Sequence, residues 1–241
     1  MLLARAARLL QISACATSAT ALRLHGAARA QVVRMQSTSP DVSRFYTQPR
    51  PDATKDYVMQ QTMIRVKDPT KSLAFYCDIL GFNMVMHREF PQWGFNVYFV
   101  AQIDPANIPS DPKEQWALCM NTPGCIELTW NYGSETAEGL VYNTGNSDKT
   151  GSVDGQPVKG GFGHLGITVP DVYTACERFK AMGCEFTKTP NSGGMKGLAF
   201  VKDPDGYLVE VLPRGEMITK PVDCDGIAVD GGSGYVDNSK A

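Results

Sequence analysis

The first regular pattern in the chain lies at residues 60–66 (QQTMIRV), where polar and apolar residues alternate. Alternation with a period of two predicts a β-strand. Gln61 and Arg65 fall on one face of this strand, and Ile64 and Val66 fall on the other. We therefore expect the Arg65 guanidinium to lie on the same side of a sheet as the Gln61 amide.

A helix is predicted directly after this strand. Asp68 supplies an N-cap with Pro69 at the first helical position, and apolar residues recur at helical spacing up to Gly81. Two strands are then expected in FNMVMHREF and FNVYFVAQ, followed by the polar insert DPANIPSDPKEQ. The segment WALCM-NTPG-CIELTW predicts a hairpin of two strands across its Asn-Thr-Pro-Gly turn.

Residues 161–213 repeat this order of elements. GHLGITV alternates as a strand, Asp171 caps a helix that ends at Gly183, and CEFTKTP, GLAFV and YLVEVLP predict three further strands. Two such runs can arise by chance in any α+β protein. However, both have an aspartate at the helix N-cap and a glycine at which the helix ends, and this favours a duplication. We predict an α+β fold of two βαβββ units, residues 57–142 and 161–213.

The remaining segments differ from the two units. We interpret 41–56 as an N-terminal arm, 143–160 as a polar linker or insert, and 214–241 as a flexible tail. Residues 1–40 contain five arginines and no acidic residue, which is typical of an organelle transit peptide; a disordered tail or an unused upstream start is the alternative. The mitochondrion is the expected compartment, ahead of the plastid or the cytoplasm.

Composition and charge argue against several classes of protein. Without the 40-residue segment the net charge falls from −2 to about −7, so the chain has no electrostatic reason to bind nucleic acid. No apolar run approaches about 18 residues, so we expect no membrane helix. The seven cysteines show no CxxC or paired spacing, which indicates reduced thiols.

Candidate chemistry lies at equivalent positions of the two units. A polar residue opens the first strand of each unit and a glutamate lies within its last strand: Gln61 with Glu127, and His164 with Glu210. A carboxylate in an apolar strand needs a partner or a metal. If a pseudo-twofold axis relates the units, the four side chains can surround one divalent cation, for which imidazole, amide and carboxylate ligands are suitable.

Each of these residues also has a simpler interpretation. A lone histidine at a strand start is more often structural, Glu127 could lie on an exposed edge strand, and Gln61 could face solvent. Arg65 could be an ordinary surface charge. Against this, strand alternation places Asn131 and Thr129 on the face of Glu127, so that an amide and the Arg65 guanidinium would lie near the cation and could bind ligand carboxylates.

Several motifs resemble the glyoxalase I (lactoylglutathione lyase) family of the vicinal oxygen chelate superfamily. They are QQTMIRVKDPTKSLAFYCDILGF, IELTWNYG, GNSD, GFGHLGITVPDVYTAC and MKGLAFVKDPDGYLVEVLP, and they span about residues 57–213. The insert before WALCM resembles the longer, eukaryotic form, which is associated with zinc more than nickel. The resemblance implies isomerisation of the hemithioacetal of methylglyoxal and glutathione to S-D-lactoylglutathione through an enediolate.

The resemblance also implies roles for individual residues. Gln61, Glu127, His164 and Glu210 match the metal ligands, with Zn²⁺ as the expected ion and Ni²⁺ or Co²⁺ as alternatives. Glu210 would be the principal base, and Glu127 could serve the other substrate stereoisomer. In this family the site is shared between two chains of a homodimer, with Gln61 and Glu127 from one and His164 and Glu210 from the other.

Glutathione contacts follow from the same resemblance. Arg65 and Asn131 match positions that hold the glutamyl end of glutathione, and Lys188 and Lys196 match or lie near those that hold its glycyl end. Lys159 stands close to where the family usually has an arginine, and a lysine can neutralise a carboxylate without bidentate geometry. Another thiol, such as trypanothione, is therefore an alternative to glutathione.

Two other functions stay open on the same fold. An epimerase acting on a CoA thioester would share the proton abstraction, and a metal-free small-molecule binding protein would use the same pocket without catalysis. A ring-cleaving dioxygenase needs two histidines and a carboxylate around iron. His25 lies in the presumed transit segment and His87 lies outside the four equivalent positions, so the two histidines of a dioxygenase iron site are not available and this function is disfavoured.

Overall fold

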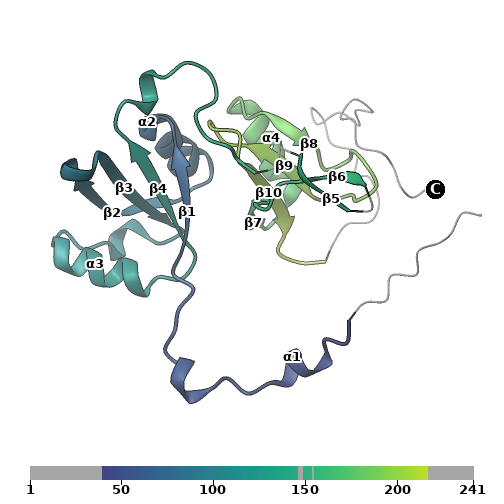
Figure 1. Ribbon diagram of the computed structural model, residues 1–241, viewed down its shortest axis with the longest axis horizontal. Coiled ribbons are helices and arrows are strands. Elements are labelled where there is room, and N and C mark those ends of the chain that lie inside the picture. Colours follow the sequence, from purple (N-terminus) through teal and green to yellow (C-terminus); the bar gives the residue numbers. More distant parts are fainter. Residues whose placement is uncertain (1–39, 146–148, 154, 217–241) are drawn as a thin grey trace, which may run out of the picture. The chain divides into compact units, whose positions relative to one another are not determined.

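The computed structural model describes residues 40–145, 149–153 and 155–216 (Figure 1). The chain divides into two compact units, Met1–Asp52 and Ala53–Ala241. In the first unit the structure describes a short helix, α1 (Ser43–Thr47). Residues 1–39 of the expected transit peptide and residues 217–241 of the expected tail lie outside the described residues.

The first βαβββ repeat forms a four-stranded mixed sheet of order β1-β4-β3-β2. Its edge strand β1 runs parallel to β4, and the other neighbours are antiparallel. A short helix follows β1 and continues as a π-helical segment. These elements are β1 (Gln61–Val66), α2 (Pro69–Leu73), the π segment (Ala74–Ile79), β2 (Asn83–Phe90), β3 (Phe95–Ala101) and β4 (Cys125–Asn131).

The second repeat has the same strand order, β7-β10-β9-β8, with β7 parallel to β10 (Figure 1). Its elements are β7 (Leu165–Val169), α4 (Val172–Ala181), β8 (Phe186–Lys188), β9 (Ala199–Lys202) and β10 (Leu208–Pro213). The registers match as well: Phe99 pairs with Glu127 in the first sheet, as Phe200 pairs with Glu210 in the second. This confirms the predicted duplication.

The predicted helix starts and stops are also confirmed. The Asp68 carboxylate accepts hydrogen bonds from the backbone N–H groups of Thr70 and Lys71, and Asp171 accepts one from Thr174. These bonds satisfy N–H groups that have no partner within the helix. Gly81 and Gly183, with φ of 76° and 80°, follow the two helices in the left-handed region that glycine adopts most readily.

The predicted hairpin at 116–130 is wrong in its first arm. Residues Pro112–Asn121 form helix α3, and only the second arm is a strand, β4. Asp111 caps α3 by accepting from the N–H groups of Lys113 and Glu114, with Pro112 at the first helical position. The segment WALCM has no β-branched residue, so nothing in it opposes a helix once the cap has formed.

The polar segment 143–160, which we interpret from the sequence as a linker or insert, contains secondary structure in its described residues. It contains a two-stranded antiparallel sheet of β5 (Lys149–Val153) and β6 (Gln156–Lys159), which pair with each other. Single 3₁₀ turns occur at Asp52–Thr54, Pro91–Trp93, Pro105–Asn107 and Ser134–Thr136.

The buried apolar side chains form two groups, and the larger one joins the two repeats. The larger combines residues of both repeats, including Val66, Tyr76, Val209 and Val211, none of which is exposed to solvent. The smaller lies between α3 and the opposite face of the first sheet and includes Cys119. Both are apolar, so their burial stabilises the fold through the hydrophobic effect.

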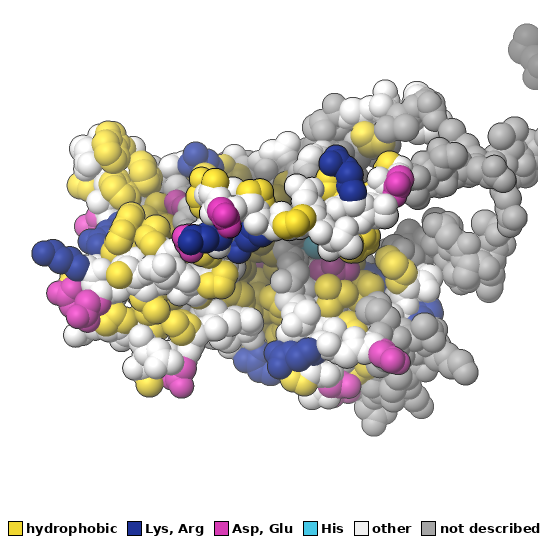
Figure 2. Space-filling model, turned by 90° about the horizontal axis from the view of Figure 1, so that it is seen from below, with side chains coloured by type: hydrophobic (Ala, Val, Ile, Leu, Met, Phe, Trp, Pro, Cys, Tyr) yellow, Lys and Arg dark blue, Asp and Glu magenta, His cyan; other side chains and the backbone are white. Residues whose placement is uncertain are grey.

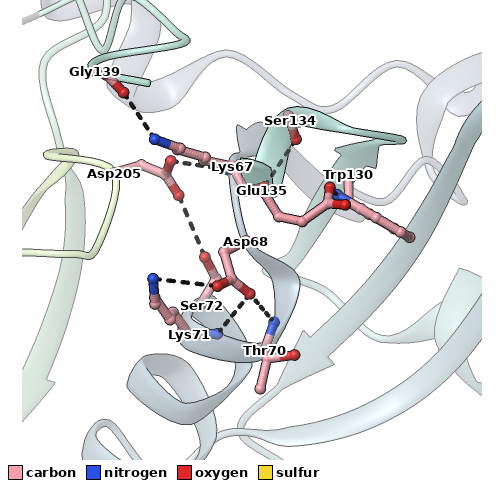
Figure 3. Close-up of polar contacts among 10 residues, drawn as sticks. All are labelled: Lys67, Asp68, Thr70, Lys71, Ser72, Trp130, Ser134, Glu135, Gly139 and Asp205. Atoms are coloured by element: carbon pink, nitrogen blue, oxygen red, sulfur yellow. Dashed lines mark hydrogen bonds and ion pairs between the residues drawn. The ribbon is translucent and has the colours of Figure 1, made fainter. Parts of the chain in front are cut away.

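Polar contacts reinforce the joint between the two repeats. The turn between β9 and β10 places Asp205 beside α2, where its carboxylate accepts from the Lys67 N–H at 2.9 Å and from the Ser72 hydroxyl at 3.3 Å (Figure 3). In the same turn Asp203 accepts from the buried Tyr76 hydroxyl at 2.9 Å. The acidic turn of the second repeat thus binds the start of the first helix.

Several large apolar side chains stay exposed, among them Trp93, which is 68% exposed, and Trp116, which is 50% exposed. Figure 2 shows hydrophobic side chains at several places on the face that it presents, with charged groups between them. Five cysteines in the described part of the chain are free thiols. Within the same residues, no helix has both the length and the apolarity to cross a membrane.

Replacing Asp203 by Asn is expected to change how stability depends on pH. Burial raises the pKa of Asp203 to about 6, so between pH 4 and 6 the folded chain binds more protons than the unfolded chain. The contribution of this group to stability is therefore present at low pH and is lost as pH rises through 6. The unfolding free energy of Asp203→Asn relative to the parent should increase by up to roughly 3 kcal/mol from pH 4 to 7.

The measurement is denaturant unfolding at a series of pH values. Asp78→Asn, which alters an exposed carboxylate on the π segment, is the matched control and should leave the pH profile unchanged. Parallel profiles for Asp203→Asn and the parent would contradict the prediction.

Candidate active site

In the first repeat, Gln61 and Glu127 come together on one sheet face. Gln61 is the first residue of β1, and Glu127 lies in the middle of the adjacent parallel strand β4. The Gln61 amide Nε2 donates a hydrogen bond to Glu127 Oε2, and the Thr129 hydroxyl donates one to Glu127 Oε1 at 3.1 Å. Neutral donors thus contact both oxygens of a half-buried carboxylate.

In the second repeat, His164 and Glu210 form the equivalent pair. His164 directly precedes β7, and its Nε2 lies 3.0 Å from Oε2 of Glu210 in β10. The Phe200 ring packs edge-on against the imidazole, with centroids 5.1 Å apart. The Glu210 side chain is 17% exposed and that of His164 is 40% exposed. The partner that Glu210 requires in its apolar strand is therefore the imidazole.

The four residues lie in the chain as two pairs. Among the described residues, no three His, Cys, Asp or Glu side chains form a group that could hold a metal ion. Gln61 with Glu127 and His164 with Glu210 are thus two separate pairs in the described part of one chain. Each pair presents a nitrogen or amide group beside a carboxylate, which is half of a four-ligand set.

The polar neighbours predicted for the first pair are where strand alternation puts them. The Arg65 guanidinium donates from Nη1 to Asn131 Oδ1 at 3.4 Å, and the Asn131 amide donates to the Tyr142 hydroxyl at 3.2 Å. Arg65 is exposed. A guanidinium and an amide therefore lie together on the face of Glu127.

The predicted lysines occupy different surroundings. Lys188 pairs in register with Phe200, which places it on the sheet face of Glu210. It is buried, and its ammonium donates to the Leu198 carbonyl at 2.7 Å and to the Thr189 carbonyl at 3.1 Å. Burial, with a smaller contribution from the charge of Lys196, lowers the pKa of Lys188 to about 8.

Lys196 is engaged in a similar way. Its ammonium donates to the main-chain carbonyls of Asn191, at 2.8 Å, and Gly193. Main-chain carbonyls thus accept from two of the three N–H donors of each ammonium. Lys159 ends β6, and its side chain lies outside what the structure describes.

The sequence analysis did not identify Arg88, which lies on the same face of the first sheet as Glu127. Arg88 pairs with Val97, which pairs with Thr129, and paired residues point to the same face of a sheet. A β-bulge between Met84 and Met86 reverses the alternation of β2. Simple alternation from the start of the strand therefore assigns Arg88 to the opposite face.

Three comparisons relate the chain to known proteins. The family model described as "Glyoxalase/Bleomycin resistance protein/Dioxygenase superfamily" matches residues 58–211. The protein named lactoylglutathione lyase of Pseudomonas putida is 45% identical over 160 residues, covering 66% of this chain and 87% of that protein. The lactoylglutathione lyase of Schizosaccharomyces pombe is 37% identical over 173 residues, covering 72% of this chain and 50% of that protein.

Solved structures give related matches. Glyoxalase I from Zea mays matches with a TM-score of 0.46 and 27% identity, over 66% of this chain and 45% of that one. The trypanothione-dependent glyoxalase I of Leishmania major matches with a TM-score of 0.44 and 25% identity, over 65% of this chain and 86% of that one. From the family model and the Pseudomonas relative together, we conclude that the chain belongs to the glyoxalase/bleomycin resistance protein/dioxygenase superfamily.

Proposed function

We propose that this protein is a lactoylglutathione lyase that converts the hemithioacetal of methylglyoxal and glutathione into S-D-lactoylglutathione. The observation that carries the proposal is the repeated pairing of a nitrogen-bearing side chain with a strand glutamate, Gln61 with Glu127 and His164 with Glu210. This pairing occurs in a chain that is 45% identical to a lactoylglutathione lyase. The reaction needs a base that removes and returns one proton, and a strand glutamate can supply it.

The side chains of the two pairs fit a divalent metal. An amide, an imidazole and two carboxylates are suitable ligands for Zn²⁺, Ni²⁺ or Co²⁺, and the long insert before β4 favours Zn²⁺. Two carboxylates would also balance the charge of the ion. A cation held by these four groups would polarise the neighbouring carbonyl and hydroxyl oxygens of the substrate.

The proton transfer is assigned to the glutamates. Glu210 is more enclosed than His164, and the imidazole 3.0 Å away holds its carboxylate in place, so that it can act as a general base. It removes the proton from the carbon that bears the sulfur and returns a proton to the neighbouring carbon. Glu127, at the equivalent position, serves the other substrate stereoisomer.

The thiol part of the substrate is assigned to polar groups around the pairs. Arg65 and Asn131 would hold the glutamyl end of glutathione through charge-assisted hydrogen bonds. Lys188 and Lys196, with Lys159, would hold the glycyl end; the ammonium groups of Lys188 and Lys196 each have a third N–H donor besides the two that bond main-chain carbonyls.

We also propose that the active form is a homodimer. Each chain contributes two half-sites, and Gln61 and Glu127 of one chain face His164 and Glu210 of the other. The separation of the two pairs within the described part of the chain supports this arrangement. The arginine-rich composition of residues 1–40 supports delivery to the mitochondrion, and a fluorescent fusion of that segment that stayed in the cytosol would contradict it.

The experiment that tests the function is a thioester assay on the purified full chain. Absorbance of the product should appear with methylglyoxal and glutathione together, disappear after treatment with a chelator, and return with Zn²⁺, Ni²⁺ or Co²⁺. A parallel assay with trypanothione tests the choice of thiol. Failure to turn over methylglyoxal with any thiol and any of these metals would overturn the proposal and leave the epimerase or binding function.

A further inference from the structure

We propose that Tyr142 is a further binding residue for the thiol and that, together with Arg65 and Asn131, it selects the α-carboxylate at the glutamyl end. The inference rests on the proposed function, because it concerns the thiol of the same hemithioacetal. It adds a hydroxyl donor, carried by the loop that follows β4, to the two groups already assigned to this end.

The loop that carries Tyr142 is tied to the end of β1. Lys67 directly follows β1, and its ammonium donates to the Gly139 carbonyl at 2.9 Å (Figure 3). The Ser134 hydroxyl donates to the Lys67 carbonyl at 2.8 Å. The loop is thus fixed at two points between β4 and Tyr142, and it returns to the end of β1 on which Arg65 lies.

Hydrogen bonds link the three side chains in one direction. Arg65 Nη1 donates to Asn131 Oδ1 at 3.4 Å, and the Asn131 amide donates to the Tyr142 hydroxyl oxygen at 3.2 Å. Among the described residues, no acceptor is bonded to the Tyr142 O–H. The hydroxyl hydrogen at the end of this chain is therefore available to a ligand.

The three side chains together present donors to a ligand. The Asn131 oxygen accepts from Arg65 and the Tyr142 oxygen accepts from Asn131, so the groups that remain are N–H and O–H donors. In the described part of the chain, no carboxylate forms an ion pair with the Arg65 guanidinium. The glutamyl end of glutathione has a carboxylate and an ammonium group, and a cluster of donors around a guanidinium binds the carboxylate.

This cluster lies at a suitable distance from the reacting carbons. Glu127 and Asn131 are both on β4, on the same sheet face, with backbones about 13 Å apart along the strand. An extended thiol whose sulfur lies near Glu127 reaches toward Asn131 with its longer, glutamyl arm. Tyr142 is half-buried, and the reduced access of water strengthens its hydrogen bond to a charged group.

The test compares two thiols on the full-length protein. Methylglyoxal hemithioacetals of glutathione and of γ-aminobutyryl-cysteinylglycine, which lacks only the α-carboxylate, are assayed, and the ratio of their kcat/KM values is the readout. Tyr142→Phe should lower the ratio of glutathione to analogue by about tenfold, because one hydrogen bond to a charged group is lost. The change should be in KM for glutathione, since this bond is equally strong in the ground state and the transition state.

Tyr132→Phe is the matched control, because it removes a tyrosine hydroxyl that bonds Asn96 instead. It should leave the ratio unchanged. The parent protein should prefer glutathione to the analogue. Equal melting temperatures of Tyr142→Phe and the parent would show that the changed ratio arises from binding and not from a damaged fold.

The outcomes separate this inference from the proposed function. If the parent turns over both hemithioacetals equally well, the α-carboxylate is not recognised and the inference is overturned. It is also overturned if Tyr142→Phe leaves the ratio unchanged or lowers both kcat/KM values equally, or if Tyr132→Phe lowers the ratio to the same extent; in each of these cases the proposed function stands. If the parent turns over methylglyoxal with neither thiol, the proposed function itself fails.

Discussion

Replacing Glu210 by Gln is expected to lower the turnover of the methylglyoxal–glutathione hemithioacetal by a factor on the order of 10³. Glutamine has nearly the same shape and keeps a side-chain oxygen that can face His164 Nε2, which lies 3.0 Å from the carboxylate in the parent protein. It cannot accept a proton from carbon. The variant should therefore fold normally and lose the chemical step, which the thioester assay measures directly.

Metal content separates the two roles assigned to Glu210. If Glu210→Gln still binds about one metal ion per site and is inactive, the lost function is the base; if the metal is lost as well, the role as ligand dominates. Glu185→Gln is the matched control, because Glu185 is an exposed glutamate of the same repeat that pairs with Lys202. It should retain full activity. Turnover of Glu210→Gln above about one tenth of the parent rate would contradict the assignment.

The sequence was informative wherever a local signal decides the structure. Alternation in 60–66 placed Arg65 beside Gln61, and the caps at Asp68 and Asp171 marked two helix starts that the structure confirms. Equivalent positions in a repeat then predicted the two pairs of polar side chains. The caps and the alternation depend on near neighbours in sequence, and the two pairs follow from the shared order of elements in the repeats.

Other features depend on interactions that a residue pattern does not show clearly. The segment WALCM is apolar enough for a strand, and Asp111-Pro112 upstream, the same signal as Asp68-Pro69, decides for a helix. The bulge in β2 is set by pairing with β3, so the face of Arg88 could not be found by alternation. Whether a pair is completed by the same chain or by a second chain depends on how whole repeats pack against each other. No periodic pattern of neighbouring residues predicts this packing.

Mixing two inactive variants is expected to restore activity if the sites are shared between chains. One variant carries Gln61→Ala with Glu127→Ala and the other carries His164→Ala with Glu210→Ala, so that neither homodimer has a complete site. In a mixed dimer, one site combines the intact His164 and Glu210 of the first variant with the intact Gln61 and Glu127 of the second. The other site has no intact pair.

Co-expression with two affinity tags isolates the mixed dimer, which should show about half of the parent kcat, because one of its two sites is complete. If all four residues acted within one chain, both chains of the mixed dimer would lack a pair and activity would stay near zero. The single-variant homodimers, purified in the same way, set the baseline. Recovery of activity would therefore establish that Gln61 and Glu127 of one chain act with His164 and Glu210 of a second chain. This arrangement explains why the described part of one chain contains two separate pairs.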